Sequence, residues 1–332
     1  MSKIVGVTVT YGQRSDYLYK VIDGLRAQGV SSLVVVDNGA RWAVKETLET
    51  RYAGFVSVVP MGRNQGSAAG YAAGLRYAAS SDADFIFLLD DDNLPRAGCI
   101  STLLDAHARL QQSSQGPLAL LAFRPEHQPD VAAGVPASRV NLRNNSFRGF
   151  HLKDVPYKLL RRLHSRKPGP GTIADLVKMD IAPYSGMFFR RELIDQIGLP
   201  KADFVLYTDD SEFTYRVTHA GGRIMLVTKA QIDDLETSWN TRKETKTTSF
   251  DIVLNQGSDL RVYYGTRNGV YFGRYCRPSN RLVSWLNRET YMALLRLKAL
   301  RAGKTARYGL VRRAVQDGLA KRLGEHPEFP LP

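Results

Sequence analysis

The sequence predicts an α/β fold with a mostly parallel central sheet, followed by a helical C-terminal region. Three observations support this fold class. Short β-branched runs alternate with helix-like segments through the first third of the chain. The apolar run 85–89 ends abruptly in Asp90, Asp91 and Asp92, and the last quarter has helical periodicity. Strands separated by single helices form right-handed βαβ units, and their ligands bind at the carboxyl ends of the strands.

The expected elements of the first third follow in order along the chain. Strands are predicted at 3–10, 32–37, 55–59 and 84–89, with a helix at 15–28. After Asn64, the glycines Gly66, Gly70 and Gly74 recur every four residues in an Ala-rich helix. This spacing gives the helix a smooth face that permits close approach to a strand or to a ligand, and both uses stay open.

The three adjacent carboxylates at the end of the apolar run predict a cation site. Like charges this close repel, and a bound divalent cation would neutralise them. Hard oxygen ligands favour Mg²⁺ or Mn²⁺. The alternative is an Asp-rich cap on a helix that begins after Pro95, for which one aspartate would suffice.

Three loops leave the sheet at the edge where the carboxylates lie, at 10–14, 37–39 and 63–66. None contains a G-x-G-x-x-G fingerprint or a phosphate loop ending in Gly-Lys-Ser/Thr, which disfavours a dehydrogenase or an ATPase. Side chains that hold a base or ribose fit these loops better. Taken singly, each loop is better explained by turn chemistry than by a binding site. The convergence of the three loops with the triple aspartate reverses that preference.

Charge is concentrated near the end of the chain. The 332 residues carry a formal net charge of +14, and residues 257–332 hold 15 Lys/Arg against 5 Asp/Glu, so ten excess charges lie there. An anionic partner is therefore expected: nucleic acid, an acidic membrane or a phosphorylated substrate. Two cysteines, an N-terminus without an apolar leader and a mean hydropathy of −0.27 favour a cytoplasmic protein.

The ordered set of motifs resembles glycosyltransferase family 2, whose members are inverting enzymes with a GT-A fold. Thr-Tyr-Gly-x-Arg, Val-Val-Asp-Asn-Gly, Asn-Gln-Gly-Ser-Ala-Ala-Gly and the triple aspartate occur in that order. Tyr-Ser-Gly-Met-Phe-Phe from Tyr184, Asp209-Asp210 and Tyr-Tyr-x-x-Arg-Asn from Tyr263 follow. The last motif resembles a signature of the branch that contains galactofuranosyl- and rhamnosyltransferases.

The resemblance implies a role for particular side chains. Asp90 and Asp92 would bind Mn²⁺ or Mg²⁺ that stabilises the departing diphosphate. Asp234 stands roughly where related enzymes supply a histidine ligand, and either a third metal ligand or a surface turn is open for it. Asp210 would be the general base and Asp209 would orient the acceptor, although both also suit a helix N-terminus. The remaining assignments are nucleotide-sugar binding by Thr10, Tyr11, Gly12, Arg14, Asp37, Arg63, Asn64 and Asp91, and acceptor binding by Tyr184, Gly186 and Trp239.

We expect two regions. Residues 1–240 form the GT-A glycosyltransferase domain, in which 124–178 is an irregular basic insertion that acts as a lid or is a solvated loop. Residues 241–332 comprise a polar linker to about Gln256 and a basic helical region. Its apolar stripe between Val283 and Leu300, flanked by cations, suits an anionic membrane, or packing against the catalytic domain or a second subunit.

The expected activity is metal-dependent inverting transfer from a nucleotide sugar, with UDP-galactofuranose or dTDP-rhamnose favoured. The acceptor would be a glycan or a polyprenyl-diphosphate-linked glycan in bacterial polysaccharide or cell-wall synthesis, at the inner face of the cell membrane. The alternatives are a nucleotidyltransferase, whose Gly-rich first loop is missing, and a nucleic-acid-binding protein, for which no binding module is recognised. No nucleic-acid partner is expected.

Overall fold

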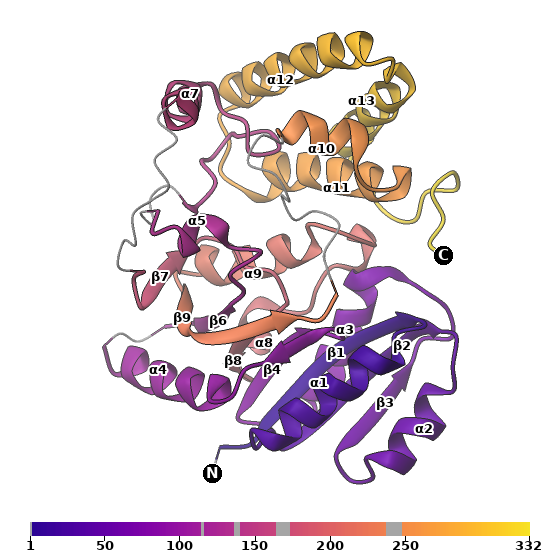
Figure 1. Ribbon diagram of the computed structural model, residues 1–332, viewed down its shortest axis with the longest axis vertical. Helices are drawn as coiled ribbons and strands as arrows, with labels where there is room; N and C mark the ends of the chain where they lie inside the picture. The colour runs from indigo at the N-terminus through magenta and orange to yellow at the C-terminus, as the bar shows by residue number, and fades with distance from the viewer. Residues whose placement is uncertain (1, 114–115, 136–139, 164–172, 237–247) are drawn as a thin grey trace.

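A mixed sheet of nine strands forms the centre of the described chain. The computed structural model describes residues 2–113, 116–135, 140–163, 173–236 and 248–332 (Figure 1). The strand order is β3-β2-β1-β4-β8-β6-β9-β5, with β7 beside β9. The strands are β1 (Ile4–Gly12), β2 (Ser32–Ala40), β3 (Val56–Pro60), β4 (Phe85–Asp90), β5 (Asn93–Pro95), β6 (Leu118–Phe123), β7 (Leu176–Met179), β8 (Met187–Arg190) and β9 (Arg223–Asp234).

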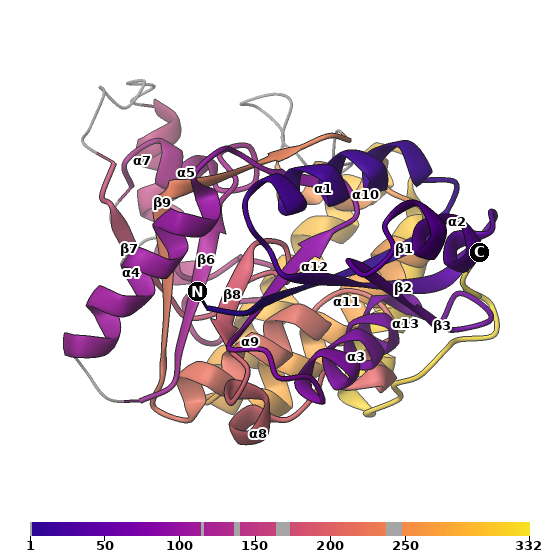
Figure 2. The ribbon, with the colours of Figure 1, turned by 90° about the horizontal axis from the view of Figure 1, so that it is seen from below.

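The first four strands in this order are parallel, which confirms the βαβ prediction for the first third. Helices α1 (Ser15–Ala27) and α2 (Val44–Arg51) cover one face, and α3 (Gly66–Ala79) covers the other (Figure 2). A Cβ at Gly74 would lie 2.5 Å from Cγ1 of Val7, and one at Gly70 would lie 2.8 Å from Cγ1 of Val9. The two glycines therefore let α3 lie directly on β1, which is the packing use of the smooth face.

The rest of the sheet is mixed, so the parallel pairing of the first third does not continue through it. β8 runs antiparallel to both β4 and β6, and β9 is parallel to β6 but antiparallel to β5 and β7. The strand–helix alternation that predicts parallel pairing stops after Phe123, and a strand reached by a long connection can enter in either direction. The helices of this half are α4 (Cys99–Ser113), α8 (Leu193–Ile197), η2 (Ala202–Phe204) and α9 (Asp209–His219).

Two segments expected to be irregular contain regular structure. The 124–178 insertion forms α5 (Pro129–Ala132), η1 (Leu152–Asp154), α7 (Val155–Leu163) and β7. α7 is strongly amphipathic but only nine residues long, so its pattern is present in the sequence over little more than two turns. The expected linker contains α10 (Ser249–Asn255), which begins with a capping box between Thr248 and Asp251; residues 241–247 lie outside the described chain.

The C-terminal region is helical, as predicted, and lies above the sheet in Figure 1. It consists of α10, α11 (Asp259–Tyr271), the π-helical turn η3 (Phe272–Cys276), α12 (Arg281–Arg301) and α13 (Thr305–Leu319). Its core includes Val205, with Leu206 and Tyr207 packed against it, from the loop before α9. The C-terminal helices thus share a hydrophobic core with the loop that precedes α9. Nowhere in the described chain is a helix long and apolar enough to cross a bilayer.

Candidate active site

The carboxyl ends of β1 and β4 bring three predicted donor-site residues together. Residue pairs Val9–Asp90 and Thr10–Asp37 align the ends of β4, β1 and β2. The hydroxyl of Thr10 donates to Asp91 Oδ2 at 2.8 Å, and Arg14 Nε donates to Oδ1 at 2.8 Å. Because Asp91 is only 3% exposed, this pairing fixes the turn that follows β4.

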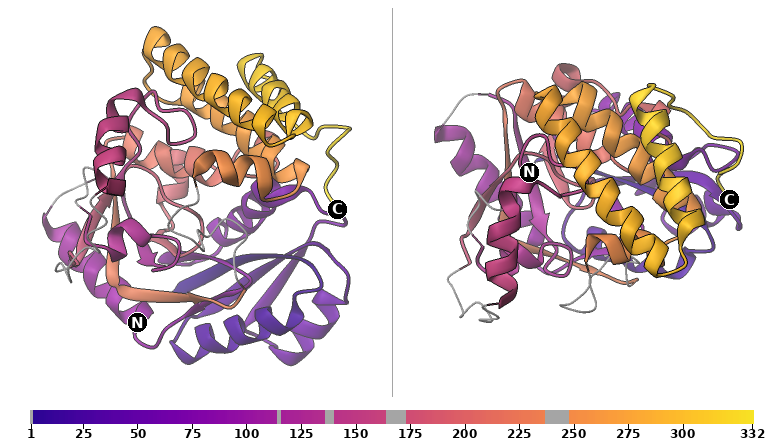
Figure 3. Two further views of the ribbon diagram at one scale, coloured as in Figure 1. Left: turned by 45° about the horizontal axis from the view of Figure 1, so that its top comes forward. Right: turned by 90° about the horizontal axis from the view of Figure 1, so that it is seen from above.

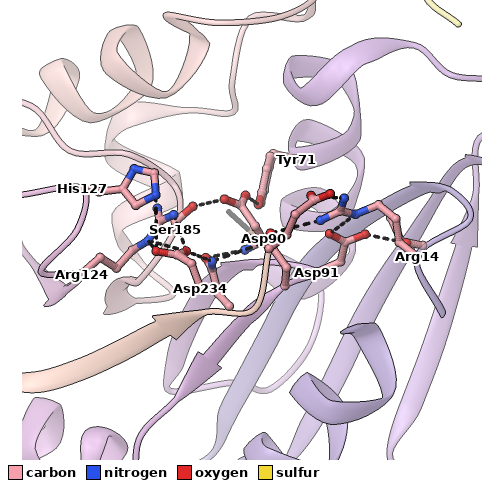
Figure 4. Close-up of polar contacts among 12 residues, drawn as sticks. Arg14, Tyr71, Asp90, Asp91, Arg124, His127, Ser185 and Asp234 are labelled. Atoms are coloured by element: carbon pink, nitrogen blue, oxygen red, sulfur yellow. Dashed lines mark hydrogen bonds and ion pairs between the residues drawn. The ribbon is translucent and has the colours of Figure 1, made fainter. Parts of the chain in front are cut away.

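Asp90 points to the other side of the β4 end, toward α3 and the start of β8. The Tyr71 hydroxyl lies 2.8 Å from Asp90 Oδ1, and the Ser185 hydroxyl donates to Oδ2 (Figure 4). One turn earlier on α3, the Ser67 hydroxyl donates to Asp209 Oδ2 at 2.9 Å. A single face of α3 therefore contacts both the triple aspartate and the Asp209–Asp210 pair.

Asp234 reaches the site from β9, because β5 pairs with β9 directly after the triple aspartate. Asn93 is opposite Asp234 in this ladder, and Asn93 Nδ2 donates to Asp234 Oδ1 at 2.8 Å. Arg124 Nε lies 3.0 Å from Asp234 Oδ1, and His127 Nε2 lies 3.3 Å from Oδ2. Figure 4 shows Arg124 and His127 on one side of the aspartates and Arg14 on the other.

Arg124 and His127 were missed at the sequence level, where no histidine received a role. Arg124 follows the apolar run of β6, so it is a charge at the carboxyl end of a buried strand, like Asp90. The same reasoning that selected the triple aspartate would have selected Arg124. His127 does not follow an apolar run directly. A turn after β6 brings it to Asp234, so nothing in the local sequence indicates that it belongs to the site.

Negative charge exceeds positive charge at this edge. Asp90, Asp91, Asp92, Asp234 and Glu236 carry five negative charges when ionised, and the ion-paired guanidinium groups of Arg14 and Arg124 supply two positive charges. The edge therefore has an excess of negative charge, which a divalent cation would reduce. Burial raises the pKa of Asp91 to about 6, against the opposing effect of Arg14. Burial and the charges of Asp90 and Asp91 raise the pKa of Asp92 to about 7.

The donor chemistry of these carboxylates fits Mg²⁺ or Mn²⁺. Within the described ranges, no three acidic, histidine or cysteine side chains are gathered in a ready-made metal cluster. Each aspartate instead has a protein partner: Asp90 has Ser185, Asp92 has Arg14 and Asp234 has Arg124. Asp234 has the most side-chain partners of the three, namely Arg124, His127 and Asn93, so Asp90 and Asp92 stay the first candidates, and metal binding by Asp234 stays a prediction.

Asp209 and Asp210 begin α9 at the opposite side of the site. Asp209 is 2% exposed and turned toward Ser67 and the buried Tyr184 hydroxyl, whereas Asp210 is only half-buried. Burial, then the charge of Asp210, raises the pKa of Asp209 to about 7. Burial raises the pKa of Asp210 to about 6, with hydrogen bonds from Ser211 opposing the shift and the charge of Asp90 adding to it. Of the two acids, Asp210 is the one open to a second substrate.

The loop before α9 is held in a rarely populated conformation by the Tyr-Tyr-x-x-Arg-Asn motif. Three non-glycine residues, Val205, Tyr207 and Thr208, have φ between +64° and +66°. Asn268 Nδ2 lies 2.7 Å from Phe204 O, 2.8 Å from Leu206 O and 2.9 Å from Tyr207 O. Arg267, which is 1% exposed, donates to Asn268 Oδ1 and to Phe204 O. We call Arg267 and Asn268 the clamp.

The other predicted donor-site residues lie at the same edge in less confined positions. Tyr11 is 40% exposed beside the Arg14 guanidinium, and Gly12 O accepts from the backbone of Arg41. Asp37 Oδ1 accepts from Ala40 N at 2.9 Å. Arg63 pairs with Glu325, and Asn64 bonds to Asn38 and to the carbonyl of Pro332.

The three predicted acceptor residues have different surroundings. Tyr184 is buried between the rings of Tyr71 and Phe213. Gly186 has φ +91°, and a Cβ there would lie 3.1 Å from Ile232 and 3.2 Å from Ala122. Trp239 lies outside the described residues. Their contact with an acceptor stays a prediction.

Comparison with known proteins agrees with this architecture. The sequence model of the family "Glycosyl transferase family 2" matches residues 7–119. A curated relative, the galactofuranosyltransferase GlfT1 of Mycolicibacterium smegmatis, is 25% identical over 225 residues, 66% of this chain and 67% of the relative. The crystal structure of GalNAc-T7 with UDP, GalNAc and Mn²⁺ has a TM-score of 0.53 at 12% identity. That match covers 90% of this chain but 54% of the solved one, and it shows a GT-A fold.

Proposed function

Because the chain belongs to glycosyltransferase family 2, we propose that it transfers a sugar from a nucleotide-sugar donor to an acceptor hydroxyl, with inversion at the anomeric carbon. The supporting observation is the shared face of α3. Ser67 bonds to Asp209 and Tyr71 bonds to Asp90, one helical turn apart. Inversion requires a base and a leaving-group site on opposite sides of the reacting carbon, and this helix contacts one carboxylate of each of the two acidic groups.

In this proposal Asp210 is the general base. Its half-buried carboxylate takes the proton of the acceptor hydroxyl, and the acceptor oxygen forms a bond to the anomeric carbon as the bond from that carbon to the diphosphate breaks. The nucleoside diphosphate leaves with the bonding electrons. Asp209, held by Ser67, keeps the start of α9 and thus Asp210 in place.

Thr10, Arg14 and Asp91 would form the floor of the donor site. Asp91 is already paired with Thr10 and Arg14, and in this proposal the lone pairs that these two bonds leave free would accept from ribose or sugar hydroxyls. Arg14, which also lies over the rings of Tyr11 and Tyr17, holds the loop after β1 against the triple aspartate. A Mn²⁺ or Mg²⁺ ion bound at Asp90 and Asp92 would supply charge stabilisation to the diphosphate leaving group.

The donor we favour is UDP-galactofuranose, with dTDP-rhamnose as the second choice. Support comes from the Tyr-Tyr-x-x-Arg-Asn motif and from similarity to a galactofuranosyltransferase. The proposed acceptor is a glycan, free or linked to polyprenyl diphosphate, in bacterial polysaccharide or cell-wall synthesis. We further propose that the enzyme is cytoplasmic and works at the inner face of the membrane, where a lipid-linked acceptor is available.

The test is a panel of sugar nucleotides with Mg²⁺ or Mn²⁺, scored by release of the nucleoside diphosphate and by thermal stabilisation. We expect stabilisation by one donor, dependent on the cation, and turnover once an acceptor sugar is added. Asp210→Asn is the matched control, because it should keep donor-induced stabilisation and lose turnover. Failure of every donor to stabilise the protein or to react would refute the proposal.

A further inference from the structure

The outer face of α12 exposes two groups of large apolar side chains, which are separated by two helical turns that carry the exposed Glu289 and Ala293 and which no described segment covers. The opposite face of the helix packs into the C-terminal core through Tyr291, Met292, Leu295 and Ala299. Six large side chains point outward, and we call them the α12 stripe: Leu282, Trp285, Leu286, Leu294, Leu297 and Leu300. They are between 42% and 70% exposed. The helix is therefore apolar on two sides, and only one side is used in folding.

A second helix extends this stripe. η1 and α7 expose Leu152, Tyr157, Leu159 and Leu160. Leu152 N donates to Asn287 Oδ1 on α12 at 3.0 Å, which ties the two elements together. Figure 3 shows α7 and α12 on the same outer face, away from β1–β3. An exposed apolar surface spread over two helices is typical of an interaction site.

A cavity of about 370 Å³ opens beside this face, at the N-terminal end of α12. Three arginines, Arg274, Arg281 and Arg288, line it together with Trp285 and the hydroxyl groups of Ser146 and Ser284. Arg288 pairs with Glu289, whereas no ion pair joins Arg274 or Arg281 to a carboxylate within the described chain. The cavity therefore offers two uncompensated guanidinium groups, which suit the planar, multi-oxygen geometry of a phosphate.

Two glycines keep the cavity open. Gly269 and Gly273 lie one turn apart in its wall, and a Cβ added at either would meet no atom within 4 Å. Neither has a positive φ. Backbone conformation therefore does not explain the glycines, and a larger residue at Gly269 would fill the cavity without displacing the protein around it.

We propose that the α12 stripe docks on an anionic lipid bilayer and that the arginine-lined cavity takes the phosphate group of one lipid. Charge complementarity selects this occupant. Arg281, Arg296 and Arg301 are exposed beside the stripe, and residues 257–332 carry ten excess positive charges. Apolar side chains would enter the acyl region while arginines meet the headgroups. The inference rests on the proposed function only in that a lipid-borne acceptor would make such docking useful.

The experiment is co-sedimentation of the full chain with vesicles, without any sugar nucleotide. We expect binding to vesicles that contain phosphatidylglycerol, release as salt rises, and little binding to pure phosphatidylcholine. Each neutralised arginine in Arg274→Gln/Arg281→Gln should lower vesicle affinity about fivefold. Leu282→Ser/Leu286→Ser should abolish binding at either composition, and Gly269→Leu should weaken only the preference for the anionic lipid.

The matched control is Lys20→Gln/Arg26→Gln, which removes the same charge from exposed positions of α1 on the opposite side of the molecule. This variant should bind vesicles nearly as the parent does. Equal loss in the control would mean that total charge, not this face, drives binding, and would overturn the proposal. So would equal binding to neutral and anionic vesicles, or a stable dimer that Leu282→Ser/Leu286→Ser dissociates.

Inorganic phosphate separates a lipid headgroup from a free anion. If phosphate stabilises the parent but not Gly269→Leu, while vesicle binding is the same for both, the cavity binds a free anion and the lipid assignment is wrong. Turnover with a soluble acceptor is measured in parallel. A protein that transfers sugar but ignores vesicles would refute the docking surface and leave the proposed function intact.

Discussion

Asn268→Ala tests whether the clamp shapes the active site. Asn268 is fully buried, and its Nδ2 group is within hydrogen-bond distance of the carbonyls of Phe204, Leu206 and Tyr207. The alanine removes both amide protons. Phe204 O keeps Arg267 and Leu206 N as donors, whereas the carbonyls of Leu206 and Tyr207, which lie just before Asp209, lose the donor that Asn268 supplies. We expect a loss of both stability and turnover.

The magnitude follows from the contacts. Two amide protons serve three carbonyls, and a buried acceptor deprived of its donor costs about 1–3 kcal/mol, so the free energy of unfolding should fall by about 2–6 kcal/mol. Each non-glycine residue with positive φ stores about 1–3 kcal/mol of strain. If release of one such residue favours a relaxed loop by that amount, kcat falls roughly five- to 150-fold.

The assay combines denaturant unfolding with kcat for the folded fraction. Asn287→Ala is the matched control: Asn287 is also buried, donates to Asn145 O and accepts from Leu152 N, but lies on α12 away from Asp210. It should lose comparable stability and keep kcat with a soluble acceptor. If the Asn268 variant also keeps kcat once corrected for unfolded protein, the clamp is purely structural and the reasoning fails.

Three further predictions concern the site itself. Asp210→Asn should lower kcat about a hundred- to ten-thousand-fold, with donor binding near that of the parent. In the parent, kcat/KM should rise as the pH passes through about 6, because only ionised Asp210 accepts a proton. The folded-state pKa of Asp210 lies above its ordinary value, so ionisation of Asp210 costs folding free energy. In denaturant titrations Asp210→Asn should therefore be more stable than the parent at pH 8 and lose that advantage by pH 4. If the pH profile of kcat/KM is the same in the variant and the parent, Asp210 is not the base. Asp92→Asn should abolish turnover and cation-dependent donor binding in calorimetry while the circular dichroism spectrum stays native, and full activity of the parent in excess chelator would contradict this. Gly66→Ala places a Cβ 2.0 Å from Val205 O at φ +85°, whereas the Cβ of Gly62→Ala meets nothing within 4 Å at φ +75°. Gly66→Ala should therefore destabilise the protein more than Gly62→Ala, which costs only about 1–2 kcal/mol of left-handed backbone strain. Equal melting temperatures of the two variants would refute the clash.

Local patterns predict the first third of this fold well. The strands around Val7, Val35, Val58 and Phe87 are recognisable because each is a short apolar run separated from the next by one helix, and all four pair in parallel, with β4 beside β1. β8 is different: Phe188 lies between β4 and β6 in antiparallel orientation after a long connection. Strand direction there depends on tertiary packing, which hydrophobic periodicity does not contain.

The site divides in the same way. Asp90, Asp91 and Asp92 are adjacent in sequence and end an apolar run, so their grouping is visible without a structure. The Arg124 and His127 contacts with Asp234 depend on β9 crossing to β5, a pairing between residues 141 positions apart. Long-range pairing of this kind leaves no local signature, which explains why a histidine beside the aspartates was overlooked.

The clamp also limits how this enzyme can be recombined. Asp203 O accepts from Gly324 N, and Arg267 donates to Gly324 O as well as to Phe204 O, so chain segments more than 50 residues apart meet at one point. A chimera that exchanges the C-terminal helices with those of a relative, in order to change the acceptor, would separate the strained loop from the side chains that hold it. Such grafts should succeed only when residues 203–208 travel with the helices. The unit of exchange is discontinuous in sequence, and a crossover placed at the apparent boundary near residue 240 would divide it.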